Sequence, residues 1–169
     1  MIFNFTQVIP QDLNNQEPIL ISGLDTLELD GIEYLVIDNN EKILFEIRYE
    51  YHCSPFKQAN IIDTILAVGY EENFYLFDLS TKTNILRLKM EGYFGHLYLD
   101  NDNFLVADAR GLYCIDKFSI IVWKNNNLGI DGVIINDFVD NTILGSGEWN
   151  PPGGWRDFTL DRQTGNLIE

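Results

Sequence analysis

The chain has 169 residues, of which 46% are hydrophobic and 22% are charged, and its formal net charge at pH 7 is −15. A chain of this length is expected to form one domain, residues 1–169, with a hydrophobic core of its own. The charge excludes nucleic acid and anionic membrane surfaces as partners, because both carry the same sign as the protein. Apolar residues at helical spacing are scarce, so we expect an all-β fold.

The first residues contain no basic segment followed by a long apolar stretch, so we expect no signal peptide. Cys53 and Cys114 lie far apart and form no paired motif, which favours two reduced thiols. No segment approaches the length of a membrane-spanning helix. These features predict a cytoplasmic protein.

A four-residue pattern, apolar-any-apolar-Asp, recurs along the chain in steps of 40, 38 and 45 residues. A period near forty is typical of a repeated all-β unit, and propeller blades have this length. Because aspartate forms turns with its own backbone, we interpret each aspartate as a turn former. The four copies are residues 35–38, 75–78, 113–116 and 158–161.

Turn residues separate short apolar strands within each copy. In the third copy we expect a strand at 104–107 and then a hairpin at 108–111, in which Gly111 supplies a positive φ. In the first copy we expect the first strand at 27–29. The predicted β-meander repeats span approximately residues 19–50, 60–91, 96–124 and 133–169.

The run 161–167, Asp-Arg-Gln-Thr-Gly-Asn-Leu, resembles the turn between the last two strands of blades in WD40-like and quinoprotein-like β-propellers. Residues 78–85 are a looser version of it. The resemblance implies four β-meander repeats that form a small or incomplete β-propeller-like fold, as a closed ring or an open stack. The Gly-His and Trp-Asp marks of WD40 repeats are absent, and the tryptophan positions of quinoprotein repeats are not regularly filled. We therefore expect no cofactor.

Acidic residues are concentrated in two stretches that contain no Lys or Arg, residues 1–41 and 125–155. Acidity of this kind either keeps a β-rich protein soluble or captures a basic protein by charge complementarity. For the chain as a whole we favour a basic protein partner.

The 45-residue step contains an insertion, residues 147–154, rich in Gly, Pro and Trp. Extra loops on repeat scaffolds often carry function, and Trp and Arg are enriched at interface hot spots. In the alternative interpretation, the two tryptophans fold back over the end of the sheet. The candidate partner-binding residues, here and in the acidic stretch, are Glu148, Trp149, Trp155, Arg156, Asp157, Asp137 and Asp140.

Catalytic and metal-binding patterns are weak. His52 and His96 are not part of a ligand-spaced cluster. Residues 100–103 lack the later ligands of a calcium loop, and 145–147 is not a nucleophile elbow. We interpret the connection 49–60 as a plain loop, although it can line a binding edge. We therefore expect neither an enzyme nor a metal site.

Three functions remain as hypotheses. The first is an acidic, non-enzymatic protein-binding module, similar in type to the cytoplasmic immunity proteins with which bacteria neutralise basic toxin or nuclease domains. The second is a carbohydrate-active or hydrolytic propeller-type domain, which needs two carboxylates about 5–10 Å apart near the loop tryptophans. The third is a structural scaffold repeat within a larger assembly.

Overall fold

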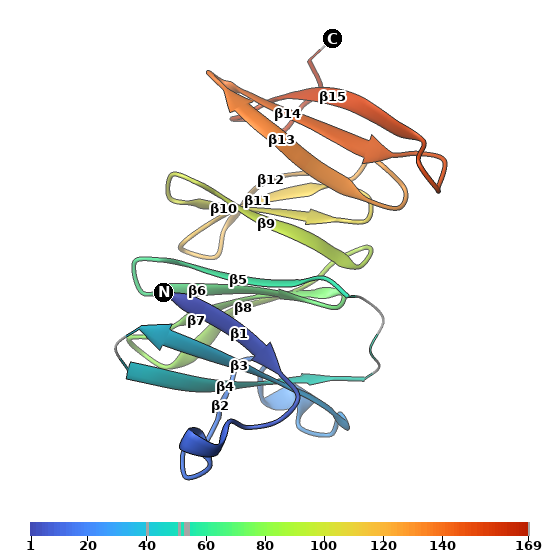
Figure 1. The fold of residues 1–169 in the computed structure, drawn as a ribbon. Helices are drawn as coiled ribbons and strands as arrows, with labels where there is room; N and C mark the ends of the chain where they lie inside the picture. Colours follow the sequence, from blue (N-terminus) through green and yellow to red (C-terminus); the bar gives the residue numbers. More distant parts are fainter. Residues whose placement is uncertain (40, 51, 53–54, 169) are drawn as a thin grey trace.

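Four β-sheets stacked along the chain make up the protein (Figure 1). The computed structural model describes residues 1–39, 41–50, 52 and 55–168. The helices in this part are two short 3-10 turns, Gln11–Leu13 and Leu24–Thr26. None of the described helices has the length and apolar character needed to cross a membrane. The all-β prediction is therefore confirmed.

The second, third and fourth sheets are antiparallel meanders in which consecutive strands pair. The second sheet contains β5 (Lys57–Ile62), β6 (Ile65–Tyr70), β7 (Asn73–Asp78) and β8 (Thr83–Lys89). The third contains β9 (Phe94–Asp100), β10 (Asn103–Asp108), β11 (Leu112–Asp116) and β12 (Ile121–Asn125). The fourth contains β13 (Val133–Val139), β14 (Thr142–Glu148) and β15 (Trp155–Asp161).

The first sheet is built differently from the other three. Its order is β1-β3-β4-β2, and β2 pairs with β4 in parallel. The strand expected at 27–29 is absent: these residues follow a 3-10 turn in which the Ser22 and Thr26 hydroxyls lie 2.7 Å apart. The first strand comes instead from the N-terminus. The bounds are β1 (Ile2–Thr6), β2 (Ile19–Leu20), β3 (Gly31–Asn39) and β4 (Glu41–Tyr49).

Apolar side chains fill the space between each sheet and the next. One cluster joins the first and second sheets around Phe45 and Phe77, whose rings meet edge to face at 5.6 Å. A second joins the second and third sheets around Phe74 and Phe104. A third joins the third and fourth sheets and includes Trp123. Burial of these side chains is the main force that stacks the sheets.

The signature aspartates of the last three repeats are turn formers, as predicted. Each accepts hydrogen bonds from backbone N–H groups in the turn that follows it. Asp38, in the first copy, lies instead inside β3, opposite Ile2 and Lys42. The donors are Ser80 for Asp78, Phe118 and Ile120 for Asp116, and Gln163 and Thr164 for Asp161.

The turns divide between two faces of the stack (Figure 1). The insertion face, on the right of Figure 1, carries the β6–β7, β10–β11 and β14–β15 hairpins. The opposite face carries the β5–β6, β9–β10 and β13–β14 hairpins. The first and fourth sheets lie at opposite ends of the stack, so the four repeats form an open arrangement.

Candidate functional site: the β14–β15 hairpin and the groove beside it

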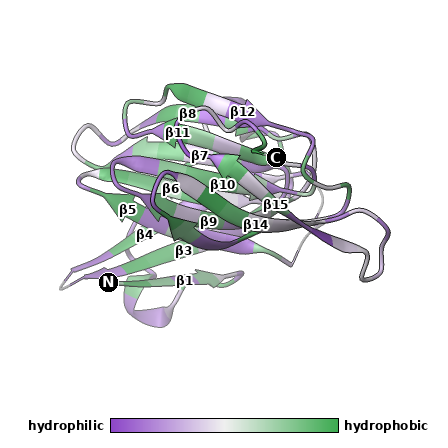
Figure 2. Ribbon diagram, turned by 90° about the horizontal axis from the view of Figure 1, so that it is seen from above, coloured by the Kyte–Doolittle hydropathy of each residue, from purple (hydrophilic) through white to green (hydrophobic). Residues whose placement is uncertain are grey.

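The insertion predicted from the sequence forms the hairpin between β14 and β15, which extends beyond the rest of the molecule (Figure 2). Glu148 and Trp155 are the last pair of the two strands. The backbone N–H of Trp149 donates to the oxygen of Gly154 at 3.0 Å, and Glu148 Oε1 accepts the N–H of Gly153 at 2.5 Å. The Glu148 side chain therefore supports the turn from within.

The two tryptophans of the hairpin have different surroundings. Trp149 is half-buried beneath Arg156, whose guanidinium carbon lies 5.8 Å from the ring centroid. Trp155 is 44% exposed and lies over Gly132, beside the end of β13. Of the residues predicted for the site, Glu148, Trp149, Trp155 and Arg156 thus come together on one hairpin.

A groove of about 350 Å³ opens beside this hairpin, between the third and fourth sheets and the connection that precedes β5. Its lining combines aromatic rings with two carboxylates. The side chains that define this aromatic groove are Phe56, Tyr93, His96, Asp131, Glu148 and Trp155.

The aromatic walls of the groove are held in place by contacts with the backbone and with one another. The Phe56 and Tyr93 rings are stacked, with centroids 6.0 Å apart and planes 17° from parallel. The Tyr93 hydroxyl donates to the main-chain oxygen of Asp131 at 2.5 Å. A Cβ at Gly132 would lie 3.3 Å from Cη2 of Trp155 and 3.9 Å from the Tyr93 hydroxyl. The absence of a side chain at Gly132 therefore leaves room for the close approach of the Trp155 ring.

The groove is negatively charged. Asp131 and Glu148 are the acidic residues in its lining, and the lining contains no Lys or Arg. Burial lowers the pKa of His96, so this imidazole is neutral at pH 7. Burial and the nearby Asp131 carboxylate raise the pKa of Tyr93 to about 12, so the phenol keeps its proton. Aromatic faces beside carboxylates attract cations.

The surface as a whole has few cations available to a partner. Among the described residues, eight of the eleven Lys and Arg side chains form ion pairs with carboxylates of the same chain. The paired cations are Lys42, Arg48, Lys57, Arg87, Lys89, Lys117, Lys124 and Arg162.

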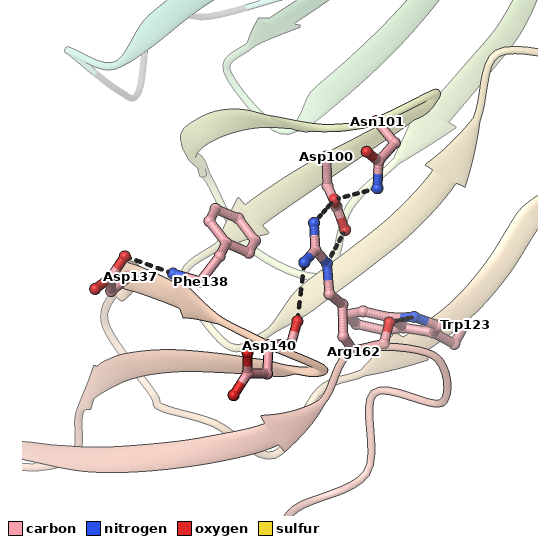
Figure 3. Close-up of polar contacts among 7 residues, drawn as sticks. All are labelled: Asp100, Asn101, Trp123, Asp137, Phe138, Asp140 and Arg162. Atoms are coloured by element: carbon pink, nitrogen blue, oxygen red, sulfur yellow. Dashed lines mark hydrogen bonds and ion pairs between the residues drawn. The ribbon is translucent and has the colours of Figure 1, made fainter.

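Asp137 and Asp140 lie away from the hairpin, near the β13–β14 turn on the opposite face (Figure 3). The seven residues of β14 separate the two turns by about 20 Å at the usual rise of a strand. Asp157 lies on β15, where its Oδ1 accepts the Ser146 hydroxyl at 2.7 Å. The structure therefore does not gather Asp137 and Asp140 with the tryptophans, whereas Asp157 lies two residues after Trp155 on β15.

The turn near Asp140 is tied to the third sheet by Arg162 (Figure 3). The Arg162 guanidinium binds both carboxylate oxygens of Asp100, and Nη1 donates to the main-chain oxygen of Asp140 at 3.1 Å. The main-chain oxygen of Arg162 accepts the indole N–H of Trp123 at 3.1 Å. The backbone of Asp140 thus takes part in the hydrogen-bonded contact that joins the third and fourth sheets through Arg162.

The sequence reasoning missed four of the six side chains that define the groove. Phe56 falls in the connection interpreted as a plain loop, and His96 was assigned only to a strand. Tyr93 and Asp131 belong to connections between repeats and carry no local motif. The repeat itself could have indicated that these residues meet, because the connections between blades lie at one face of a propeller.

Metal binding has no support from the described residues, among which no group of three or more His, Cys, Asp or Glu side chains could hold an ion. Cys114 is buried, and burial raises the pKa of its thiol to about 12. Cys53, which was predicted to be a second reduced thiol, lies outside the described residues.

No protein-family model matches the chain, and no curated protein matches its sequence. Solved structures match its fold. BamB from Moraxella catarrhalis superposes with a TM-score of 0.55 at 15% identity, over 98% of this chain and 51% of that one. The WD40 domain of Neurospora crassa Pan2 superposes with a TM-score of 0.51 at 11% identity, over 82% and 45%.

The chain thus spans about half the length of these solved structures. Identities this low show the fold alone. Together with the four stacked sheets, they confirm the predicted class: an all-β, β-propeller-like fold of four mainly antiparallel, meander-type units. The resemblance seen in the 161–167 turn is confirmed at the level of the fold.

Proposed function

We propose that this chain is a non-enzymatic module that binds a basic protein through the β14–β15 hairpin and the aromatic groove. The observation that carries the proposal is the joint position of Trp149, Trp155 and Glu148 on a projecting hairpin of a strongly acidic protein. Exposed tryptophans supply apolar anchors at interfaces, and complementary charge speeds encounter and selects the partner.

In its more specific form, the proposal is an immunity-type inhibitor that neutralises a basic toxin or nuclease domain. A nuclease must present Lys and Arg to the phosphate backbone of its substrate. A protein of charge −15, with most of its own cations already paired, competes for those side chains. Trp149 and Trp155 then fix the complex by packing against the rim of the partner's cleft.

Affinity capture from the native cell tests the proposal. We expect the full chain to retain a Lys- and Arg-rich protein at about 0.15 M salt and to release it toward about 1 M, as screening increases. Trp149→Ala and Trp155→Ala are expected to speed dissociation, whereas Trp123→Phe, in the core between two sheets, serves as the control.

The outcomes separate the general proposal from its specific form. If no captured protein depends on both salt and the hairpin tryptophans, the binding-module proposal is wrong. If a captured basic protein has a nucleolytic or toxic activity that the chain abolishes, the immunity-type form is supported. If the captured protein has no such activity, the module remains and the immunity-type form is wrong.

The hydrolytic alternative has one observation in its favour. Asp131 and Glu148 line the same groove as Trp155, so two carboxylates lie beside an exposed ring that can stack a sugar. Turnover of chromogenic glycosides that is lost in Glu148→Gln would support this alternative. Absence of turnover across a panel of such glycosides would leave the binding module as the function of the groove.

A further inference from the structure

The aromatic groove has the shape and chemistry of a receptor for one cationic side chain. Its walls are the stacked rings of Phe56 and Tyr93 and the indole of Trp155, and its acids are Asp131 and Glu148. Phe56 is 41% exposed and Trp155 44% exposed, so an incoming chain would bury aromatic surface at the rim. Burial of such rings is a large part of the energy of most interfaces.

The groove is organised before any ligand arrives. The Tyr93 hydroxyl is anchored on the main chain of Asp131, and the main-chain oxygen of Tyr93 accepts the N–H of Ala109 at 3.0 Å. Glu148 is fixed at the end of β14 by the bond from Gly153. A rigid receptor loses little conformational entropy on binding, which favours affinity for a small group.

The carboxylates retain capacity for a ligand. A carboxylate has about four acceptor positions. The bond from Gly153 occupies one position on Glu148, and the Tyr93 hydroxyl approaches Asp131 Oδ1 only at 3.4 Å. Both groups can therefore accept further hydrogen bonds from a donor inside the groove.

A guanidinium can interact with both the aromatic rings and the carboxylates of the groove. It is planar, so it stacks on aromatic faces, and its fork of N–H donors matches carboxylate oxygens in pairs. A Lys ammonium is a compact and strongly hydrated charge that gains less from flat walls. A neutral ligand can donate hydrogen bonds to the two acids but forms no ion pair with them, so it gains less.

We propose that the aromatic groove of Phe56, Tyr93 and Trp155 receives an arginine side chain of the partner, whose guanidinium pairs with Glu148 and Asp131. This inference rests on the proposed function and deepens it, because it names the group that the partner inserts. Trp149 and Arg156 of the hairpin do not line the groove and contact other parts of the partner.

The test uses three peptides, Gly-Gly-Arg-Gly-Gly and its versions with Lys and with citrulline, the uncharged isostere of Arg. Each is titrated into the full chain by calorimetry at about 0.05 M salt, where screening is weak. We expect the Arg peptide to bind at least tenfold more tightly than the citrulline peptide and severalfold more tightly than the Lys peptide. Equal binding of Arg and citrulline peptides, or of Arg and Lys peptides, overturns the assignment to arginine.

Variants locate the binding in the groove. Glu148→Gln and Trp155→Ala are each expected to weaken the Arg peptide about tenfold. Glu17→Gln, at an exposed acid just before β2 of the first sheet, changes the net charge equally and should have little effect. If Glu17→Gln weakens binding as much as Glu148→Gln, the peptide is held by general charge and the proposal is wrong.

The peptide experiment tests the groove inference and the capture experiment tests the proposed function, so either can be contradicted without the other. If a partner is captured through the hairpin tryptophans and the Arg peptide does not bind, the groove inference is wrong and the binding module stands. If the Arg peptide binds in the groove and no partner depends on the hairpin, the groove is a cation site and the proposed function is wrong. Trp149→Ala should weaken only the captured partner.

Discussion

A single residue, Arg162, joins the third and fourth sheets through its guanidinium. It pairs with both oxygens of Asp100, whose side chain is 6% exposed, and it lies 5.3 Å from the ring centroid of Phe138. A planar fork is required for this geometry, because a Lys ammonium cannot span two carboxylate oxygens and stack on a ring. The contact fixes the last sheet, which carries the candidate site.

Replacing Arg162 by Ala leaves the Asp100 carboxylate buried without its cation. We expect the free energy of unfolding to fall by about 3 kcal/mol, because an unpaired buried charge is strongly unfavourable. Urea unfolding with an unchanged m value measures this loss. Lys42→Ala is the control: its pair with Asp12 is exposed, at 42% and 55%, and should contribute less than about 1 kcal/mol. Equal losses in the two variants would contradict the argument.

Gly111 shows where local sequence rules stop. Its place in a hairpin predicted a positive φ, but its φ is not in the left-handed region. A Cβ at this position would instead lie 2.0 Å from the main-chain oxygen of Asn125. Left-handed conformations occur at other turn residues, among them Asp63, Asn101 and Asp140 in the β5–β6, β9–β10 and β13–β14 hairpins. Polar side chains that bond locally tolerate this conformation, whereas a close approach of two strands leaves no local signal.

At the scale of the element, the sequence predicts strands well where turns repeat. The strands of the second and third sheets follow the predicted repeats closely, because turn-forming aspartates mark their ends. The first sheet departs from the pattern, since β1 pairs with β3 across 24 intervening residues. That pairing depends on tertiary packing, and no local periodicity records it.

The candidate site likewise has a part that the sequence predicts and a part that it does not. The hairpin was predicted, because an insertion of Trp, Pro and Gly is visible as a break in the period. The groove was not, because Phe56 and Tyr93 meet only when two separate connections reach one face. Asp137 and Asp140 were grouped with Glu148 by proximity in sequence, although one strand places them at the other face.

The β14–β15 hairpin can be shortened without loss of the fold. Replacing residues 149–154 with Asn-Gly gives a two-residue turn that suits antiparallel strands. Because the strand pairs from Thr142–Asp161 to Glu148–Trp155 remain, we expect the free energy of unfolding to change by less than about 1 kcal/mol. Partner capture should be lost, because Trp149 is removed. A variant that unfolds readily would show that the hairpin supports the fourth sheet.

At the scale of the whole molecule, different side chains lie on the outer faces of the first and fourth sheets. Ile9 and Leu13 cover part of the outer face of the first sheet by packing on Val36 and Leu44. On the fourth sheet, Asn136 donates to the Ser146 hydroxyl, which donates to Asp157. These hydrogen-bonded polar side chains differ from the apolar cover on the first sheet.

The net charge gives salt opposite effects on folding and on binding. At −15, repulsion among carboxylates destabilises the compact chain, and the Debye length falls from about 30 Å at 0.01 M to about 8 Å at 0.15 M salt. We therefore expect the Tm, followed by circular dichroism, to rise by several degrees across this range, while the affinity for a basic partner falls. Sucrose at matched osmolarity, which does not screen charge, is the control for non-electrostatic stabilisation. A Tm that falls with salt would mean that the ion pairs, such as Lys117 with Asp63 and Asp102, outweigh the repulsion.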